Sequence, residues 1–179
     1  MSGTDRQALL GRYAEVREAV ADAARSAGRR PEDVLLLAVS KTQPLSAVEI
    51  LAAAGQMDFG ESYVQEALDK IASCRADVRW HFIGGLQSNK ARAVAGRFVL
   101  VHSLDSLKLA RSLHKRAGEL DVVQDVLMQV NLAREAQKSG VAADEAEALA
   151  EAVLGMDHLN LTGLMVLPPY DENPEASRP

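Results

Sequence analysis

Lys41 is the residue of this 179-residue chain whose type and position best suit covalent chemistry. It directly follows an apolar run at 34–40, VLLLAVS, that is typical of a buried β-strand. A lysine at a strand end can point into a cleft with little solvent, where desolvation lowers the pKa of its amine. A neutral amine can attack an aldehyde and form a Schiff base. By position alone, a solvated lysine in a surface loop is the other interpretation.

Five further residues are candidates for contact with a bound ligand, and all of them except Asn131 also have a simpler explanation. Ser62 can cap a helix, and His81 can be a core residue of an apolar strand. Asn131 ends a predicted strand. Lys138 follows in a Lys-Ser-Gly segment, where it can face an anionic ligand oxygen or only solvent. Met165 lies in an apolar strand and can simply be core. For those four residues the sequence alone leaves open whether the side chain contacts a ligand or has only the simpler role.

The elements that position these residues alternate along the chain. Short apolar runs are followed by segments of helical period, which is typical of parallel βα units. The predicted strands cover 34–40, 57–60, 80–83, 98–102, 126–131 and 161–167. The predicted helices begin near Thr4, Ser46, Ser62, Ser88, Ser106 and Ala142. Capping-box pairs predict three of these starts, namely Thr4/Gln7, Ser46/Glu49 and Ser62/Gln65.

Two α/β architectures accommodate this alternation, an open doubly wound sheet and a (β/α)8 TIM-type barrel. The glycine-rich phosphate fingerprint of a dinucleotide-binding sheet is absent after the first strand, where Lys41 stands instead. In barrels the chemistry lies where strands end and βα loops begin. We therefore favour a barrel that is incomplete, with about six of the eight βα units. The segment 84–90, GGLQSNK, is a further strand-end loop whose N–H groups can face a ligand or form a turn.

Composition narrows the possible settings and partners. The net charge of −5 argues against a nucleic-acid or anionic-membrane surface, because both need a basic patch. Cys74 is the single cysteine, so a disulfide framework is impossible, and the histidine spacing indicates no metal site. No signal-peptide pattern and no apolar run near the ~18 residues of a membrane span is seen. We expect a cytoplasmic protein with one domain over 1–179.

Five segments, in order along the chain, resemble the signatures of the pyridoxal phosphate homeostasis protein family, also called proline synthetase co-transcribed homologues. They are AVSKTQP (38–44), FGESYVQEALDK (59–70), WHFIGGLQSNK (80–90), VNLAREAQKSG (130–140) and GLMVLP (163–168). The resemblance implies a barrel similar to the N-terminal domain of alanine racemase, PLP fold type III. It implies pyridoxal 5'-phosphate (PLP) as cofactor, held as a Schiff base on Lys41, with Ser62, His81, Asn131, Lys138 and Met165 around it. It further implies a role in PLP homeostasis without robust catalysis.

The chain departs from this family in three ways. Ser62 stands where the family usually has Asn, and Gly85 stands where it often has Pro. The family also continues into two further strands that provide phosphate contacts and an arginine near the pyridine nitrogen. We therefore expect weak PLP binding and self-association through an open edge of the first strand. The alternatives are a PLP-dependent amino-acid racemase and a Schiff-base aldolase without cofactor.

Overall fold

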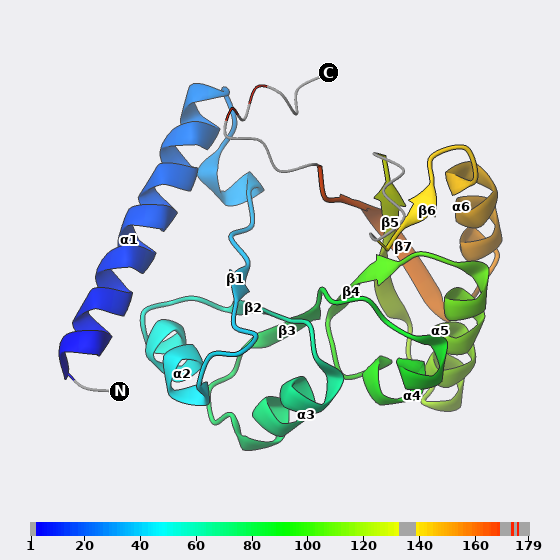
Figure 1. Ribbon diagram of the computed structural model, residues 1–179, viewed down its shortest axis with the longest axis horizontal. Helices are drawn as coiled ribbons and strands as arrows, with labels where there is room; N and C mark the ends of the chain where they lie inside the picture. Colours follow the sequence, from blue (N-terminus) through cyan, green and yellow to red (C-terminus); the bar gives the residue numbers. More distant parts are fainter. Residues whose placement is uncertain (1–2, 133–138, 169–172, 174, 176–179) are drawn as a thin grey trace. The chain divides into compact units, whose positions relative to one another are not determined.

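The computed structural model describes residues 3–132, 139–168, 173 and 175. By its internal contacts the chain divides into two compact units, Met1–Trp80 and His81–Pro179. Each unit contains parallel strands connected by helices, as the alternating pattern predicts (Figure 1). A single domain over 1–179 stays a prediction. No helix among the described residues is long and apolar enough to cross a membrane.

The first unit holds two parallel strands and three α-helices. In chain order its elements are α1 (Gly3–Ser26), the 3-10 helix η1 (Pro31–Asp33), β1 (Ala38–Val39), α2 (Leu45–Ala53), β2 (Asp58–Glu61) and α3 (Val64–Ser73). Ala38 of β1 lies opposite Phe59 of β2. The ring of Phe59 packs 6.0 Å from that of Trp80, centroid to centroid, and Val48 of α2 is also buried. These apolar contacts form the core beneath the strand ends.

The strand before Lys41 is shorter and more exposed than the sequence predicts. Of the run 34–40, only Ala38–Val39 is a strand. Leu35 is 58% exposed and Val39 is 50% exposed, so the prediction of a strand buried on both faces is wrong. The reason is that β1 pairs with β2 alone among the described strands and lies at the end of the strand order. The expected open edge of the first strand is therefore observed.

The three predicted capping boxes are wrong. Thr4 lies within α1, while Pro44 precedes α2 and Tyr63 precedes α3, neither with a side-chain cap. In α3 the amide of Gln65 donates to Asp69 at 3.0 Å instead of reaching back to the helix start. The spacing of Ser with Glu or Gln therefore does not by itself fix where α2 and α3 begin.

The second unit holds a larger parallel sheet. Its elements are β3 (Arg79–Phe82, which begins two residues before the unit), η2 (Ser88–Lys90), α4 (Ala91–Val94), β4 (Leu100–Leu104), α5 (Leu107–Glu119), β5 (Gln124–Asn131), β6 (Val141–Ala142), α6 (Ala146–Leu154) and β7 (Leu159–Val166). β4 lies between β3 and β5, and β7 pairs with β5 along its whole length. The last five predicted strands therefore match β2, β3, β4, β5 and β7, and β6 was not predicted.

One side of this sheet is covered by helices. α5 and α6 lie side by side against β5 and β7 (Figure 1). The hydroxyl of Ser106 caps α5 by accepting the N–H of Leu109 at 3.4 Å. Leu109 and Leu113 of α5 are fully buried, and the rings of Phe82 and Phe98 pack edge to face at 5.4 Å. This apolar core holds the carboxyl ends of β3, β4, β5 and β7 in place.

Candidate functional site

Lys41 follows the carboxyl end of β1, with Ser40 between the strand and the lysine. Its side chain is exposed, so the restricted solvent that the sequence analysis expects is not provided by the described residues. Its ammonium makes no hydrogen bond or ion pair with any part of the chain that the structure describes. An amine in this setting is accessible to a ligand and does not have to break an internal contact to react.

The residue after Lys41 has a strained backbone. Thr42 has φ +63°, in the left-handed region that is costly for a β-branched residue. Its N–H donates to Glu66 Oε1 of α3 at 2.6 Å. Strain of this kind persists only where the surroundings hold it, and Glu66 is one group that does.

Ser40, the residue before Lys41, forms hydrogen bonds with a buried polar cluster. Ser40 is buried, and its hydroxyl donates to Glu61 Oε1 at 2.7 Å. The carbonyl of Ser40 accepts a hydrogen bond from Lys70 Nζ at 2.6 Å. Lys70 Nζ also donates to Glu61 Oε1 and to Glu66 Oε1, both at 2.7 Å. We call Glu61, Glu66 and Lys70 the carboxylate–lysine cluster.

The charged groups of this cluster are paired with one another, because Lys70 forms ion pairs with both Glu61 and Glu66. Glu61 is fully buried and Lys70 is nearly so, with Glu66 half-buried between them and solvent. The hydrogen bond from Lys70, helped by the Thr42 N–H and the charge of Lys70, holds the pKa of Glu66 below its ordinary value. Glu66 is therefore a carboxylate at neutral pH and a strong acceptor for both donors.

Sequence reasoning missed this cluster. One local signal is the spacing of Glu66 and Lys70, four residues apart on α3, which also suits an ordinary surface ion pair. Glu61 is a carboxylate at the end of a buried strand, an uncommon position that indicates a specific partner. Neither signal identifies Ser40 or Thr42 as the groups that the cluster holds.

Ser62 belongs to the same unit as Lys41 and follows β2 directly. The helix-cap role that the sequence suggests for it is absent, because Tyr63 stands at the N-cap position. Its half-buried hydroxyl has no hydrogen-bond partner in the described part of the chain. A helix-cap role therefore does not explain Ser62, and its hydroxyl is available to a ligand.

His81 lies buried in the second unit and pairs with another histidine. Its Nδ1 is 3.0 Å from Nε2 of His102 on β4, with the rings edge to face. Burial, and to a smaller extent the neighbouring His81, lowers the pKa of His102 to about 4. At neutral pH His102 is thus uncharged, and the tautomers of the two rings decide which nitrogen donates in this contact.

The remaining candidates lie at the ends of β5 and β7. Asn131 is half-buried at the end of β5, and Met165 of β7 lies opposite Gln129 of β5. Gly140 packs so closely that a Cβ there would lie 2.8 Å from the backbone nitrogen of Asn131. Its φ of +130° also requires glycine. Lys138 lies outside the described residues.

The loop 84–90 approaches Ser139 within the second unit. A Cβ on Gly85 would lie 3.3 Å from Ser139 Oγ, so these two strand-end loops are neighbours. Ser88–Lys90 forms the short helix η2, where the sequence predicts a helix start. Among the described residues, no three histidine, cysteine, aspartate or glutamate side chains are grouped to hold a metal ion.

Comparison with known proteins gives consistent results. Residues 13–178 match the family model "Alanine racemase, N-terminal domain". A pyridoxal phosphate homeostasis protein of Pseudomonas aeruginosa is 49% identical over 157 residues, which cover 87% of this chain and 68% of the relative. The one from Escherichia coli K12 is 46% identical over 160 residues, again covering 68% of the relative. The structure of PipY from Synechococcus elongatus with PLP bound is 37% identical, with TM-score 0.73, and the match covers 85% of this chain and 72% of PipY.

Proposed function

Because this chain belongs to the pyridoxal phosphate homeostasis proteins of the alanine racemase N-terminal domain family, we propose that it binds PLP through a Schiff base on Lys41 and takes part in intracellular PLP homeostasis. Its fold is the α/β barrel type of that family, present in part. The chain spans 68% of the first two relatives that it matches. When bound, PLP supplies an aldehyde that reacts reversibly with an amine.

The observation that carries this proposal is the contrast between the two lysines of the first unit. Lys41 is exposed, unpartnered within the described residues, and placed at a strand end. Lys70 is buried and donates to three oxygens, so its Nζ would have to break these contacts to reach an aldehyde. The free amine stands where barrels place their chemistry.

The other candidates complete the proposed site. The unpartnered hydroxyl of Ser62 is suited to a ligand oxygen, and a shorter side chain there gives a looser contact than an asparagine would. The strand-end positions of Asn131 and Met165, and the buried position of His81, support roles beside the cofactor. For Lys138 we propose a contact to an anionic oxygen of PLP. We expect Lys138→Ala to weaken or alter PLP binding, measured by cofactor titration, without unfolding the protein.

We further propose that the chain is not a PLP-dependent racemase or decarboxylase. The candidates offer the amines of Lys41 and Lys138, but no evident acid–base pair on opposite faces of a bound amino acid. Solvent exchange of the α-proton of amino acids tests this directly, because racemisation requires it. Steady exchange that is lost in Lys41→Ala would show catalysis and favour the racemase alternative.

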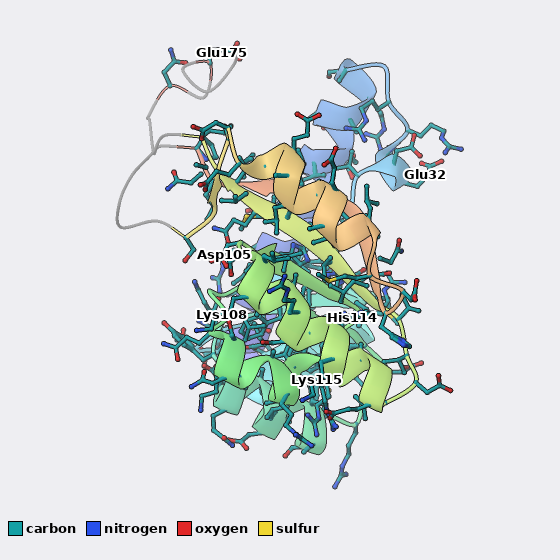
Figure 2. All side chains as sticks on the ribbon, turned by 90° about the vertical axis from the view of Figure 1, so that its right-hand side faces the viewer. Glu32, Asp105, Lys108, His114, Lys115 and Glu175 are labelled. Carbon is teal, nitrogen blue, oxygen red and sulfur yellow. The ribbon has the colours of Figure 1, made fainter. Side chains whose placement is uncertain are left out.

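Borohydride reduction followed by peptide mapping tests the attachment residue. PLP is added, the Schiff base is reduced, and the labelled peptide is identified by mass spectrometry. We expect label on Lys41 and a visible absorption band that Lys41→Ala abolishes. Lys108→Ala is the control, because Lys108 lies exposed on α5, as Figure 2 shows. Label found only on other lysines would contradict the proposal, and no absorption band at all would favour the cofactor-free aldolase.

A further inference from the structure

We infer that the carboxylate–lysine cluster of Glu61, Glu66 and Lys70 is a positioning device that fixes the backbone on both sides of Lys41 and thereby sets how fast and how tightly PLP is captured. This inference rests on the proposed attachment at Lys41 and names the residues that act through it. None of the three touches the cofactor in this proposal. They are positioning residues.

On the N-terminal side, the cluster fixes Ser40 by two separate bonds. The hydroxyl donates to Glu61 Oε1 at 2.7 Å, and the carbonyl accepts from Lys70 Nζ at 2.6 Å. The N–H of Ser40 is used as well, because it donates to the carbonyl of Gly60 on β2 at 2.9 Å. Every polar group of Ser40 is thus held, and the residue is buried.

On the C-terminal side, the cluster holds a conformation that Thr42 would not adopt alone. Its N–H donates to Glu66 Oε1 at 2.6 Å while its φ is +63°. A left-handed threonine is unfavourable, so we expect the chain to return to an ordinary conformation when the hydrogen bond from the Thr42 N–H to Glu66 is removed. That return would re-aim the bond from Cα to Cβ of Lys41, the residue between the two anchors.

The cluster acts as one unit because a single ammonium connects its two carboxylates. Lys70 Nζ donates to Oε1 of both Glu61 and Glu66 at 2.7 Å. Without Lys70, two nearby carboxylates, one fully buried, would repel each other. Removal of Lys70 therefore frees Ser40 directly and Thr42 indirectly, through Glu66.

An ordinary ion pair that attaches α3 to β2 would not need this arrangement. Its bonds would end on the two elements, whereas three bonds here end on Ser40 and Thr42. The residue between them, Lys41, is left without a partner in the described chain. A fixed base with a free amine is the arrangement that lowers the entropic cost of capturing an aldehyde.

Paired substitutions at two positions of the cluster test the inference. Lys70→Met removes the ammonium and keeps the volume, and Lys70→Arg restores a donor. Glu66→Leu removes the acceptor for Thr42, and Glu66→Gln restores an acceptor oxygen. Lys108→Met on α5 is the matched control for loss of a lysine. For each protein, the rate of appearance of the reducible Lys41 adduct and the dissociation constant for PLP are measured, with the folded fraction determined by circular dichroism.

We expect Lys70→Met and Glu66→Leu to slow adduct formation and weaken PLP binding by about tenfold or more at equal folded fraction. Lys70→Arg and Glu66→Gln should recover most of that loss, which a general loss of packing would not do. Should Lys70→Met fail to fold, the Glu66 pair decides alone, because Glu66 is half-buried.

Two results would overturn the inference, and they are distinguishable. Wild-type label on Lys41 together with unchanged rates and affinities in all folded variants would overturn the positioning role and leave the proposed function intact. Wild-type label on residues other than Lys41 would overturn the proposed function and the inference with it.

Discussion

The two lysines of the first unit, Lys41 and Lys70, differ in their exposure and in their hydrogen-bond partners. Lys41 is exposed and has no partner among the described residues, while Lys70 is buried against three oxygens. A buried ammonium needs such partners, because desolvation otherwise favours loss of its charge. Lys41 is thus accessible to a ligand, whereas Lys70 is engaged in internal contacts.

At the residue scale, the lowered pKa of His102 indicates that the free energy of unfolding depends on pH. The pKa of His102 is about 4 in the folded protein, below the ordinary 6.5. The unfolded chain therefore takes up this proton first as the pH falls. The contribution of His102 to stability is complete above about pH 6.5, decreases from there to about pH 4, and is constant below.

Urea unfolding at pH 7 and at pH 4.5 measures this effect. We expect the unfolding free energy of the wild type to fall by roughly 2 kcal/mol more than that of His102→Gln, which cannot take up the proton. The pH difference within each protein is compared, so any loss of packing in the variant cancels. Equal decreases in the two proteins would contradict the assignment.

At the element scale, the end of β5 depends on close backbone packing. β6 and β7 both pair with β5 at Val130, and Gly140 lies against Asn131. Gly140 is therefore packed against the strand end that carries Asn131. This packing explains why a glycine follows Ser139, which the family resemblance alone does not.

Gly140→Ala is expected to destabilise this strand end. Its Cβ would lie 2.8 Å from the Asn131 nitrogen, and its φ is +130°, so the backbone must move. We expect a loss of about 1–3 kcal/mol in unfolding free energy and weaker PLP binding. Gly155→Ala is the control, since a Cβ there meets ordinary contacts at 3.7 Å. Equal effects of the two substitutions in denaturant titrations would argue against a special role for Gly140.

At the scale of the whole molecule, open strand edges are the notable feature. β1 pairs with β2 alone and β7 with β5 alone among the described strands. Large apolar side chains are exposed on both, with Val39 of β1 at 50%, Leu164 of β7 at 64% and Val166 at 46%. Apolar open edges are surfaces on which another chain can add a strand.

We therefore predict self-association that depends on β1. Sedimentation velocity should show a mass that rises with protein concentration, and Val39→Lys should reduce this rise, because a charge on an edge strand disfavours pairing. Val16→Lys is a matched control. Val16 is 51% exposed but lies on α1, whose helix leaves no backbone edge open. A mass that stays that of a monomer at all concentrations would contradict the prediction.

The sequence by itself predicted the alternation of strands and helices and the place of Lys41 after the first strand. The predicted strands at 57–60, 98–102 and 126–131 overlap β2, β4 and β5. They could be predicted because the periodicity of apolar side chains indicates which residues face a core. Lys41 at a strand end could be identified for the same reason. Recognition of the family rested on long motifs around these strand ends, and the comparisons confirmed it.

Only the tertiary structure decided what supports Lys41. Ser40 and Lys70 are 30 positions apart, and Thr42 and Glu66 are 24 apart, so no local pattern connects them. The short length of β1 has a similar cause, since a strand extends only where a neighbour pairs with it. Periodicity reports whether a residue is buried. Which buried residues meet depends on strand order and helix packing, which bring distant parts of the chain together.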